Sequence, residues 1–208
     1  KLGFMPQPNN YGDTTAALAA LCITYADGHE EWLGTDESWL CTTGAVQAAE
    51  IYDGETQDFT AEPAAPQPAR LFDYGFDTIV GQENEPVRCL QRLPVVREFT
   101  APNGDHLFDF GQNLTGWVEV EIYGDKGQQL TLRHAEALDE NGNFYTENLS
   151  WAKATDTYIL SGGRQILHPH FTWHGFRYLC VEGLQYGQNV QFTACHLSTD
   201  LQQTGSFT

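Results

Sequence analysis

The prediction of the fold starts from the stretch Asp109-Phe110-Gly111-Gln112-Asn113-Leu114-Thr115-Gly116-Trp117. It continues into Val118-Glu119-Val120-Glu121-Ile122-Tyr123, where apolar and polar side chains alternate. Alternation with a period of two is typical of a half-buried β-strand. Glycines beside polar side chains allow the backbone to turn tightly. The stretch therefore predicts a strand, a sharp polar corner and a second strand.

Three polar side chains, Asp109, Gln112 and Asn113, occupy this predicted corner. The letters Asp109-Phe110-Gly111 also match the magnesium motif of protein kinases. That interpretation fails because the chain has no H-R-D catalytic loop and no glycine-rich phosphate loop. We therefore interpret the three side chains as groups that hydrogen-bond the backbone and hold the corner.

The β pattern continues on both sides of the corner. Strands are predicted over 87–93, 95–99, 117–123, 129–136, 156–160, 175–182 and 190–197. Asn103-Gly104, Asn141-Gly142 and Gly162-Gly163 between them are hairpin-type turns. Pro94 indicates a bend or an edge strand, because it cannot donate to a central ladder. Residues 147–154 are compatible with one short helical turn, and the whole pattern predicts a jelly-roll-like sandwich.

A first, acidic unit precedes this sandwich. Its strands are predicted over 21–25, 30–34, 38–42 and 50–56, after a loop or truncated strand over residues 1–15. Three prolines between residues 62 and 70 predict an extended connector. The fold class is thus all-β with two sandwich modules, the first over 1–83 and apparently truncated at its N-terminus, the second over 84–208.

Composition narrows the function classes. The formal net charge of −18 repels phosphate backbones and anionic lipids, so neither nucleic acid nor membrane is an expected partner. The five cysteines are odd in number and lack a C-x-x-C spacing, which argues against a disulfide framework and a zinc knuckle. With no signal peptide in the sequence, these free thiols lead us to expect a cytoplasmic protein.

Candidate sites are few. His168, His170 and His174 share one parity and could bind zinc if they converged. Pro169 and Gly175 interrupt the strand they would need, so we predict structural histidines and no metal site. Arg177, a lone cation among aromatic residues, predicts a structural clamp onto a carboxylate or backbone carbonyls.

One small group of side chains suggests ligand binding. Asp53 and Glu55 flank Gly54 and, together with Trp39, could bind a sugar or a calcium ion. An Asp-Gly turn with solvated acids is the alternative that needs no ligand.

Two sets of motifs together resemble a known family. The second unit carries Asp109-Phe110-Gly111-Gln112-Asn113-x-x-Gly116-Trp117, Arg133-His134-Ala135-Glu136, Tyr145-Thr146-Glu147-Asn148, Asp156-x-Tyr158 and Phe171-x-x-His174-Gly175-Phe176-Arg177-Tyr178. The first carries Tyr25-Ala26-Asp27-Gly28, Thr35-Asp36-x-Ser38-Trp39 and Ile51-Tyr52-Asp53-Gly54-Glu55. This ordered series resembles the two β-sandwiches that precede the catalytic barrel of bacterial α-L-rhamnosidases. Asp109, Gln112, Asn113, Trp117, His174 and Arg177 are its structural signature.

The resemblance implies what the parent protein does. It would hydrolyse terminal α-L-rhamnosyl bonds of rhamnose-containing glycosides by an inverting acid/base reaction. Its catalytic carboxylates would lie on an α/α barrel that follows in the same polypeptide, and residues 199–207 look like the lead-in to that barrel. We therefore expect no catalytic residue in this chain. The role of the chain would be to support the barrel.

The alternative is an autonomous carbohydrate-binding module. Some members of the family bind rhamnose with calcium on an amino-terminal sandwich, and Asp53 and Glu55 are the nearest candidates for this role. No other cofactor is expected.

Overall fold

The structure is a computed structural model, and it describes residues 14–73, 75, 77 and 79–207. The predicted loop over residues 1–15 lies almost entirely outside these residues. The strands are β1 (Ala20–Thr24), β2 (Glu30–Gly34), β3 (Leu40–Cys41), β4 (Val46–Glu50), β5 (Gly54–Asp58), β6 (Gln67–Pro68), β7 (Val87–Pro94), β8 (Arg97–Thr100), β9 (His106–Gly124), β10 (Gln129–Ala135), β11 (Ala137–Leu138), β12 (Phe144–Tyr145), β13 (Thr155–Ile159), β14 (Gly163–Leu167), β15 (His174–Glu182) and β16 (Val190–Thr199).

The all-β prediction is confirmed. The 3-10 turn η1, Glu147–Leu149, falls within the segment for which a short helical turn was predicted. No helix in the described segments is long and apolar enough to cross a membrane. All five cysteines are free thiols, as their spacing predicted.

The chain divides into two compact units. Unit 1 comprises Lys1–Gly44 and Glu62–Gly81, and unit 2 comprises Ala45–Ala61 and Gln82–Thr208. By their contacts, residues 50–56, which the sequence assigned to the first unit, group with unit 2. The reason is a non-local pairing, because β5 runs parallel to β13 with Thr56 opposite Thr157. The predicted boundary between residues 83 and 84 stays a prediction.

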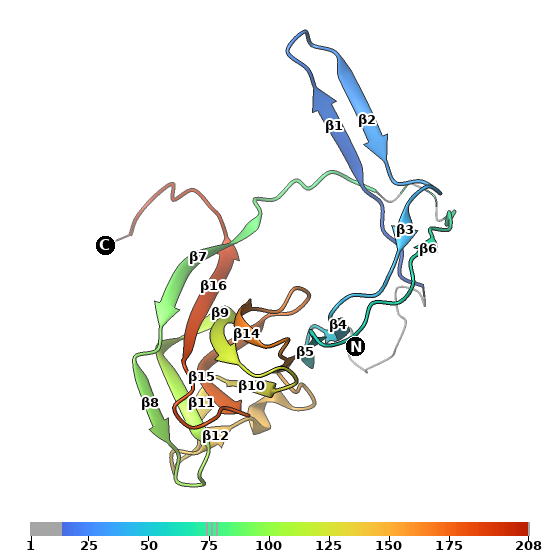
Figure 1. The fold of residues 1–208 in the computed structure, drawn as a ribbon. Coiled ribbons are helices and arrows are strands. Elements are labelled where there is room, and N and C mark those ends of the chain that lie inside the picture. Colours follow the sequence, from blue (N-terminus) through green and yellow to red (C-terminus); the bar gives the residue numbers. More distant parts are fainter. Residues whose placement is uncertain (1–13, 74, 76, 78, 208) are drawn as a thin grey trace. The chain divides into compact units, whose positions relative to one another are not determined.

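The described part of unit 1 contains two small antiparallel ladders. β1 pairs with β2 through the turn at Gly28, and β3 pairs with β6 (Figure 1). Gly28 adopts a φ of 84°, a left-handed conformation that glycine reaches without steric cost. None of the residues that the structure describes in unit 1 is buried.

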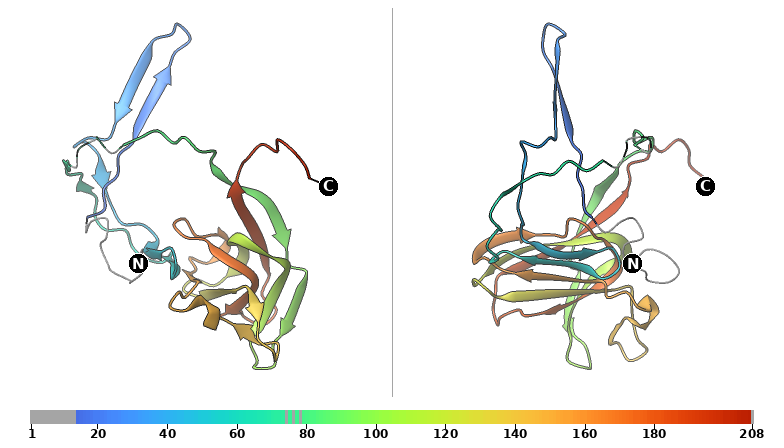
Figure 2. Two further views of the ribbon diagram at one scale, coloured as in Figure 1. Left: turned by 180° about the vertical axis from the view of Figure 1, so that it is seen from behind. Right: turned by 90° about the vertical axis from the view of Figure 1, so that its right-hand side faces the viewer.

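Unit 2 is a curled ten-stranded sheet organised by β9. The order along the sheet is β4-β5-β13-β10-β15-β9-β16-β7, and β8 and β14 also pair with β9. The 19 residues of β9 change partners along their length: the first half pairs with β8 and β15, and the second with β16 and β14. In every view β16 lies beside β7 (Figure 2).

The prediction that Asp109–Trp117 forms a corner between two strands is wrong. β9 runs through it without interruption, and the irregularity is a bulge. The register against β15 shifts between Phe176 and Tyr178, and Gly111 has a φ of 83°. Leu114 lies opposite Phe176 and Asp109 lies opposite Tyr178, so β9 has three more residues than β15 between these pairs. Bulges of more than one extra residue are uncommon. Glycine and polar side chains thus form a large bulge where we expected a turn.

The larger of two hydrophobic core clusters in the described part of unit 2 lies along one face of β9, and the smaller one contains Leu107 of the same strand. Every second residue of the strand points inward before and after the bulge: Phe108, Phe110, Leu114, Val118, Val120 and Ile122 are all buried. They pack against Leu130 and Leu132 of β10 and Phe176 and Leu179 of β15. Pro94 ends β7, the last strand in the sheet order, as the edge prediction required.

Candidate functional site

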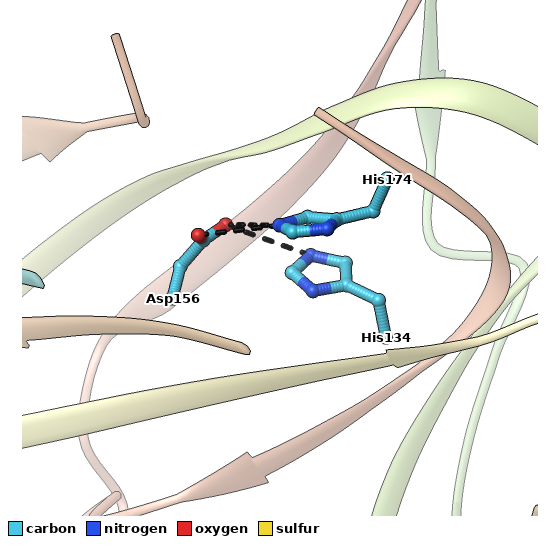
Figure 3. A group of neighbouring side chains, drawn as sticks. All are labelled: His134, Asp156 and His174. Atoms are coloured by element: carbon cyan, nitrogen blue, oxygen red, sulfur yellow. Dashed lines mark hydrogen bonds and ion pairs between the residues drawn. The ribbon is translucent and has the colours of Figure 1, made fainter. Parts of the chain in front are cut away.

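Three buried polar side chains meet in the interior of unit 2. His134 comes from β10, Asp156 from β13 and His174 from β15, and these strands are neighbours in the sheet. Their exposed fractions are 0%, 1% and 4%. Each replaces an apolar residue in the inward-facing series of its strand, and their side chains point toward one another (Figure 3).

The geometry of the cluster is asymmetric. His174 Nε2 lies 3.2 Å from both carboxylate oxygens of Asp156, whereas His134 Nε2 lies 4.0 Å from Asp156 Oδ2. The two imidazole rings are stacked, with centroids 4.2 Å apart and planes 25° apart. His174 thus contacts Asp156 directly, and His134 stacks on the ring of His174 farther from the carboxylate.

One hydrogen bond fixes the tautomer of His134. Its Nδ1 lies 2.9 Å from the carbonyl oxygen of Ala154. A carbonyl only accepts, so Nδ1 carries the proton and Nε2 presents a lone pair. That Nε2 has no hydrogen-bond partner among the residues that the structure describes.

Burial controls the charge of the cluster. It lowers the pKa of His134 to about 3, with a further contribution from His174, so His134 is neutral near pH 7. Burial alone would raise the pKa of Asp156. The hydrogen bond from His174 and that from the Glu55 amide hold it below its ordinary value, so Asp156 is an anion.

A second buried carboxylate, that of Glu55, lies next to the cluster. The Glu55 amide donates to Asp156 Oδ1 over 3.0 Å. Its own carboxylate accepts from the amides of His170 and Phe171 and from the side chain of Gln57. Glu55 therefore fastens the loop after β14 to β5.

The three residues predicted to bind a sugar or calcium lie in different environments. Trp39 belongs to unit 1 and is 50% exposed. Asp53 lies in the turn before β5, with Lys153 Nζ 3.4 Å from its carboxylate. Glu55 is 1% exposed and hydrogen-bonded as described. Their role in carbohydrate binding stays a prediction.

The Asp109 bulge is held by a clamp. Arg177 Nε and Nη2 donate to the two oxygens of Asp109 over 2.8 and 2.9 Å, and the Gly111 amide donates to Oδ1 over 2.7 Å. The Arg177 hydrogen bond, followed by that of Gly111, lowers the pKa of Asp109. Arg177 thus forks onto a carboxylate, one of the two alternatives that the sequence left open.

The other two polar residues of the bulge behave differently. Asn113 Nδ2 donates to Glu136 Oε1 over 3.0 Å, so it bonds a side chain and not the backbone. Gln112 is exposed. Trp117, at the end of the stretch, stacks on His168 with ring centroids 5.4 Å apart.

The rings of His168 and His170 contact each other, with centroids 4.9 Å apart, and no ring contact of His174 with either is found in the described residues. His168 stacks on Trp117, the amide of His170 bonds Glu55, and His174 alone reaches Asp156. Sequence reasoning missed that His134 and Asp156 complete a cluster with His174. The available signal was parity, because His134 continues the buried series Leu130, Leu132, and Asp156 shares its strand face with Tyr158.

Comparison with known proteins places this geometry in a family. The model of the alpha-L-rhamnosidase N-terminal domain matches residues 1–90. The model of the bacterial alpha-L-rhamnosidase concanavalin-like domain matches residues 99–198. The bulge, the clamp and the buried cluster all lie within the second match.

Curated relatives agree. The chain is 40% identical over 189 residues to an alpha-L-rhamnosidase of Streptomyces avermitilis, covering 85% of this chain and 18% of the relative. It is 35% identical over 179 residues to one from Alteromonas sp., covering 80% of this chain and 19% of the relative. The chain thus spans about a fifth of the length of these relatives.

Solved structures share the fold. The native rhamnosidase from Aspergillus terreus superposes with a TM-score of 0.83 at 33% identity, covering 93% of this chain and 24% of that one. The Streptomyces avermitilis enzyme complexed with L-rhamnose gives 0.76 at 34% identity, covering 88% and 19%. The chain belongs to the bacterial α-L-rhamnosidase family, of which it carries the N-terminal and concanavalin-like β domains.

Proposed function

We propose that this chain is the non-catalytic β region of an α-L-rhamnosidase, a glycoside hydrolase that releases terminal α-L-rhamnosyl groups. The observation that carries the proposal is the succession of the two family domains over residues 1–90 and 99–198. Rhamnose-containing glycosides are the substrates of the parent protein. The catalytic α/α barrel is the partner in the same polypeptide.

The carboxylates of unit 2 support a non-catalytic role. Glycoside hydrolysis requires two carboxyl groups that flank the scissile bond, and one of them must be able to donate a proton. Glu119 and Glu121 are the adjacent acidic pair on β9. Glu119 is bonded to Arg92, and Glu121 accepts from Arg164 Nε over 2.8 Å. Both carboxylates are thus engaged in ion pairs on the sheet.

A shallow surface pocket accompanies this pair. Its lining residues are Arg92, Pro94, Glu119, Glu121, Gln191 and Thr193. Arg92 lies on β7, which is separated from β9 by β16, and Arg164 lies on β14, which pairs with β9. Both ion pairs therefore join β9 to other strands of the sheet. Unit 2 accordingly supports the catalytic barrel through its folded core, and its surface carboxylates take no part in catalysis.

A rhamnosidase assay tests the proposal. The purified 208-residue chain should not hydrolyse an aryl α-L-rhamnoside. The longer polypeptide that contains this chain should hydrolyse it. Hydrolysis by the 208-residue chain that scales with its concentration would contradict the proposal. Glu119→Gln is the matched control, because loss of that turnover in this variant would identify the pair as catalytic.

Carbohydrate binding is the second candidate function, and the observation that favours it is Trp39. Its side chain is 50% exposed on unit 1, and an exposed aromatic ring offers an apolar surface to a pyranose ring. Calorimetric titration with L-rhamnose, with and without calcium, tests it. Millimolar or tighter binding that is lost in Trp39→Ala or Asp53→Ala would support a module, and no heat in either condition would reject it.

A further inference from the structure

We propose that His134, Asp156 and His174 bind a divalent transition-metal ion of the zinc type within unit 2. The cluster offers two imidazole nitrogens and a carboxylate oxygen, and these ligand atoms all lie within 4.8 Å of one another. Two histidine nitrogens and one carboxylate oxygen are a common set of protein ligands for zinc. Nitrogen donors also select against magnesium and calcium, which prefer oxygen.

One distance between ligand atoms already fits a tetrahedral metal site, and a second must shorten. With metal–ligand bonds of about 2.0–2.1 Å, neighbouring ligand atoms in a tetrahedral site lie roughly 3.3 Å apart. His174 Nε2 is already 3.2 Å from Asp156, and His134 Nε2 must approach Asp156 Oδ2 from 4.0 Å. The required movement is a rotation of one ring out of the present stack, because a metal lies in the plane of each imidazole that binds it.

His134 supplies the observation that points to a ligand. Its Nδ1–H donates to the carbonyl of Ala154, which directs the Nε2 lone pair into the cluster. A supporting hydrogen bond of this kind is a regular feature of metal-binding histidines. The Nε2 atom is fully buried and has no hydrogen-bond partner in the described residues, an arrangement that is costly for a polar atom. A cation satisfies that lone pair.

The surrounding charges fit a divalent cation. Asp156 and Glu55 are both 1% exposed, and the Glu55 amide is bonded to Asp156. The Asp156 carboxylate supplies an anionic oxygen ligand for the cation.

Metal titration of the 208-residue chain tests the proposal. After dialysis against EDTA, we expect Zn²⁺ to bind one equivalent per chain in competition with a chromophoric chelator and to raise the melting temperature. Mg²⁺ and Ca²⁺ should not change it. The Co²⁺ complex should show the visible bands of a nitrogen–oxygen site without a thiolate charge-transfer band, which excludes the cysteines as ligands.

Two variants and a matched control locate the site. His134→Gln and Asp156→Asn should weaken Zn²⁺ binding by at least about 10-fold, the lower end of the effect of losing a ligand's support. His106→Gln makes the same chemical change at an exposed histidine that is paired with Glu98, and it should bind like the wild type. The histidine ring NMR signals of the wild type report the same ligands if a variant does not fold.

Several outcomes would overturn the proposal. They are the absence of stoichiometric Zn²⁺ binding by the wild type, equal affinity in a folded His134→Gln variant, a thiolate band in the Co²⁺ spectrum, and histidine signals of His134 and His174 that do not respond to Zn²⁺. Any of the last three would assign the ion to another set of ligands. The first would leave the cluster as a hydrogen-bonded network without a metal.

Discussion

Units 1 and 2 are both built mainly from antiparallel strands with glycine turns, yet they differ in burial. Unit 2 encloses a continuous core along β9, whereas no described residue of unit 1 is buried. A two-stranded hairpin such as β1–β2 is only marginally stable in water by itself. The difference shows that local strand signals and a stable core are separate properties.

The contrast has a clear physical origin. In unit 2 each inward side chain of β9 meets strands that are distant in sequence, including β15 and β16. In unit 1 the apolar residues Trp32, Leu33 and Leu40 remain at least 50% exposed. Free energy of folding comes from apolar area removed from water, so unit 2 should carry nearly all the stability of the isolated chain.

The largest expected effect comes from a core truncation in unit 2. Phe176 is fully buried, with its ring 5.6 Å from that of Phe110 and 5.0 Å from that of His134. Phe176→Ala should lower the free energy of unfolding by about 3–5 kcal/mol. Leu33→Ala in unit 1 should change it by less than about 0.5 kcal/mol. Urea unfolding followed by circular dichroism measures both, and equal losses would break the comparison.

A pair of turn glycines should give the next largest difference. Gly54 in unit 2 has a φ of 110°, and an added Cβ would lie 1.9 Å from the carbonyl oxygen of Thr155. Gly28 in unit 1 has a φ of 84°, and a Cβ added there would meet no atom of the described residues within 4 Å. Gly54→Ala should cost on the order of 3 kcal/mol through backbone displacement. Gly28→Ala should leave the unfolding transition of unit 2 unchanged, and a shift comparable to that of Gly54→Ala would show that the hairpin is coupled to the core.

The Asp109 clamp should have an intermediate effect. Asp109→Ala removes two charge-assisted bonds from Arg177 and one from Gly111, and it should cost about 2 kcal/mol near neutral pH. Asp36→Ala in unit 1 removes a carboxylate whose pKa is lowered by the Ser38 hydroxyl on an exposed turn. That variant should not move the unfolding transition of unit 2, and equal losses would contradict the contrast.

The clamp also predicts a pH dependence with a definite sign. The folded pKa of Asp109 lies below its ordinary value of 3.8, so the folded state binds fewer protons than the unfolded state. The stabilisation is fully present above that value and is lost as the pH falls through the folded pKa. Acidification should therefore destabilise the wild type more than Asp109→Ala, as urea midpoints at a series of pH values would show. Parallel curves would exclude the clamp as a source of acid sensitivity.

The smallest effect is expected at the surface of unit 2. Arg164→Ala breaks the bond to Glu121, in which the two side chains are 61% and 43% exposed. Exposed ion pairs contribute roughly 0–1 kcal/mol and are screened by salt. The loss should shrink further at high ionic strength in the same urea experiment. A loss above that range would show that surface charges rival the core.

The sequence predicted many of the strands but not β4 or β14, and it failed where distant partners decide the outcome. Period-two alternation located β10, β15 and β16 because a strand with one buried face places apolar residues at every second position. It could not reveal that residues 50–56 make contacts with unit 2, since the parallel partner of β5 lies about a hundred residues away. The corner at Gly111 became a bulge because β9 has ladder partners on both sides.

The candidate site shows the same limit. The sequence indicated that Arg177 clamps an acceptor, but Asp109 emerged as that acceptor only when β9 and β15 were paired. His174 was placed in a histidine-rich segment, whereas its actual neighbours, His134 and Asp156, come from two other strands. Pairing of strands, which a single sequence does not reveal, creates the cluster.

Hydrogen exchange on the intact 208-residue chain tests the contrast between the units most directly. Amides of β9, β10, β15 and β16 should be protected to nearly the full free energy of global unfolding, because their opening exposes the core. Amides of β1 and β2 should exchange with little protection. Equal protection of the β1–β2 hairpin and the β9 ladder would contradict the conclusion that the stability of this chain resides in unit 2.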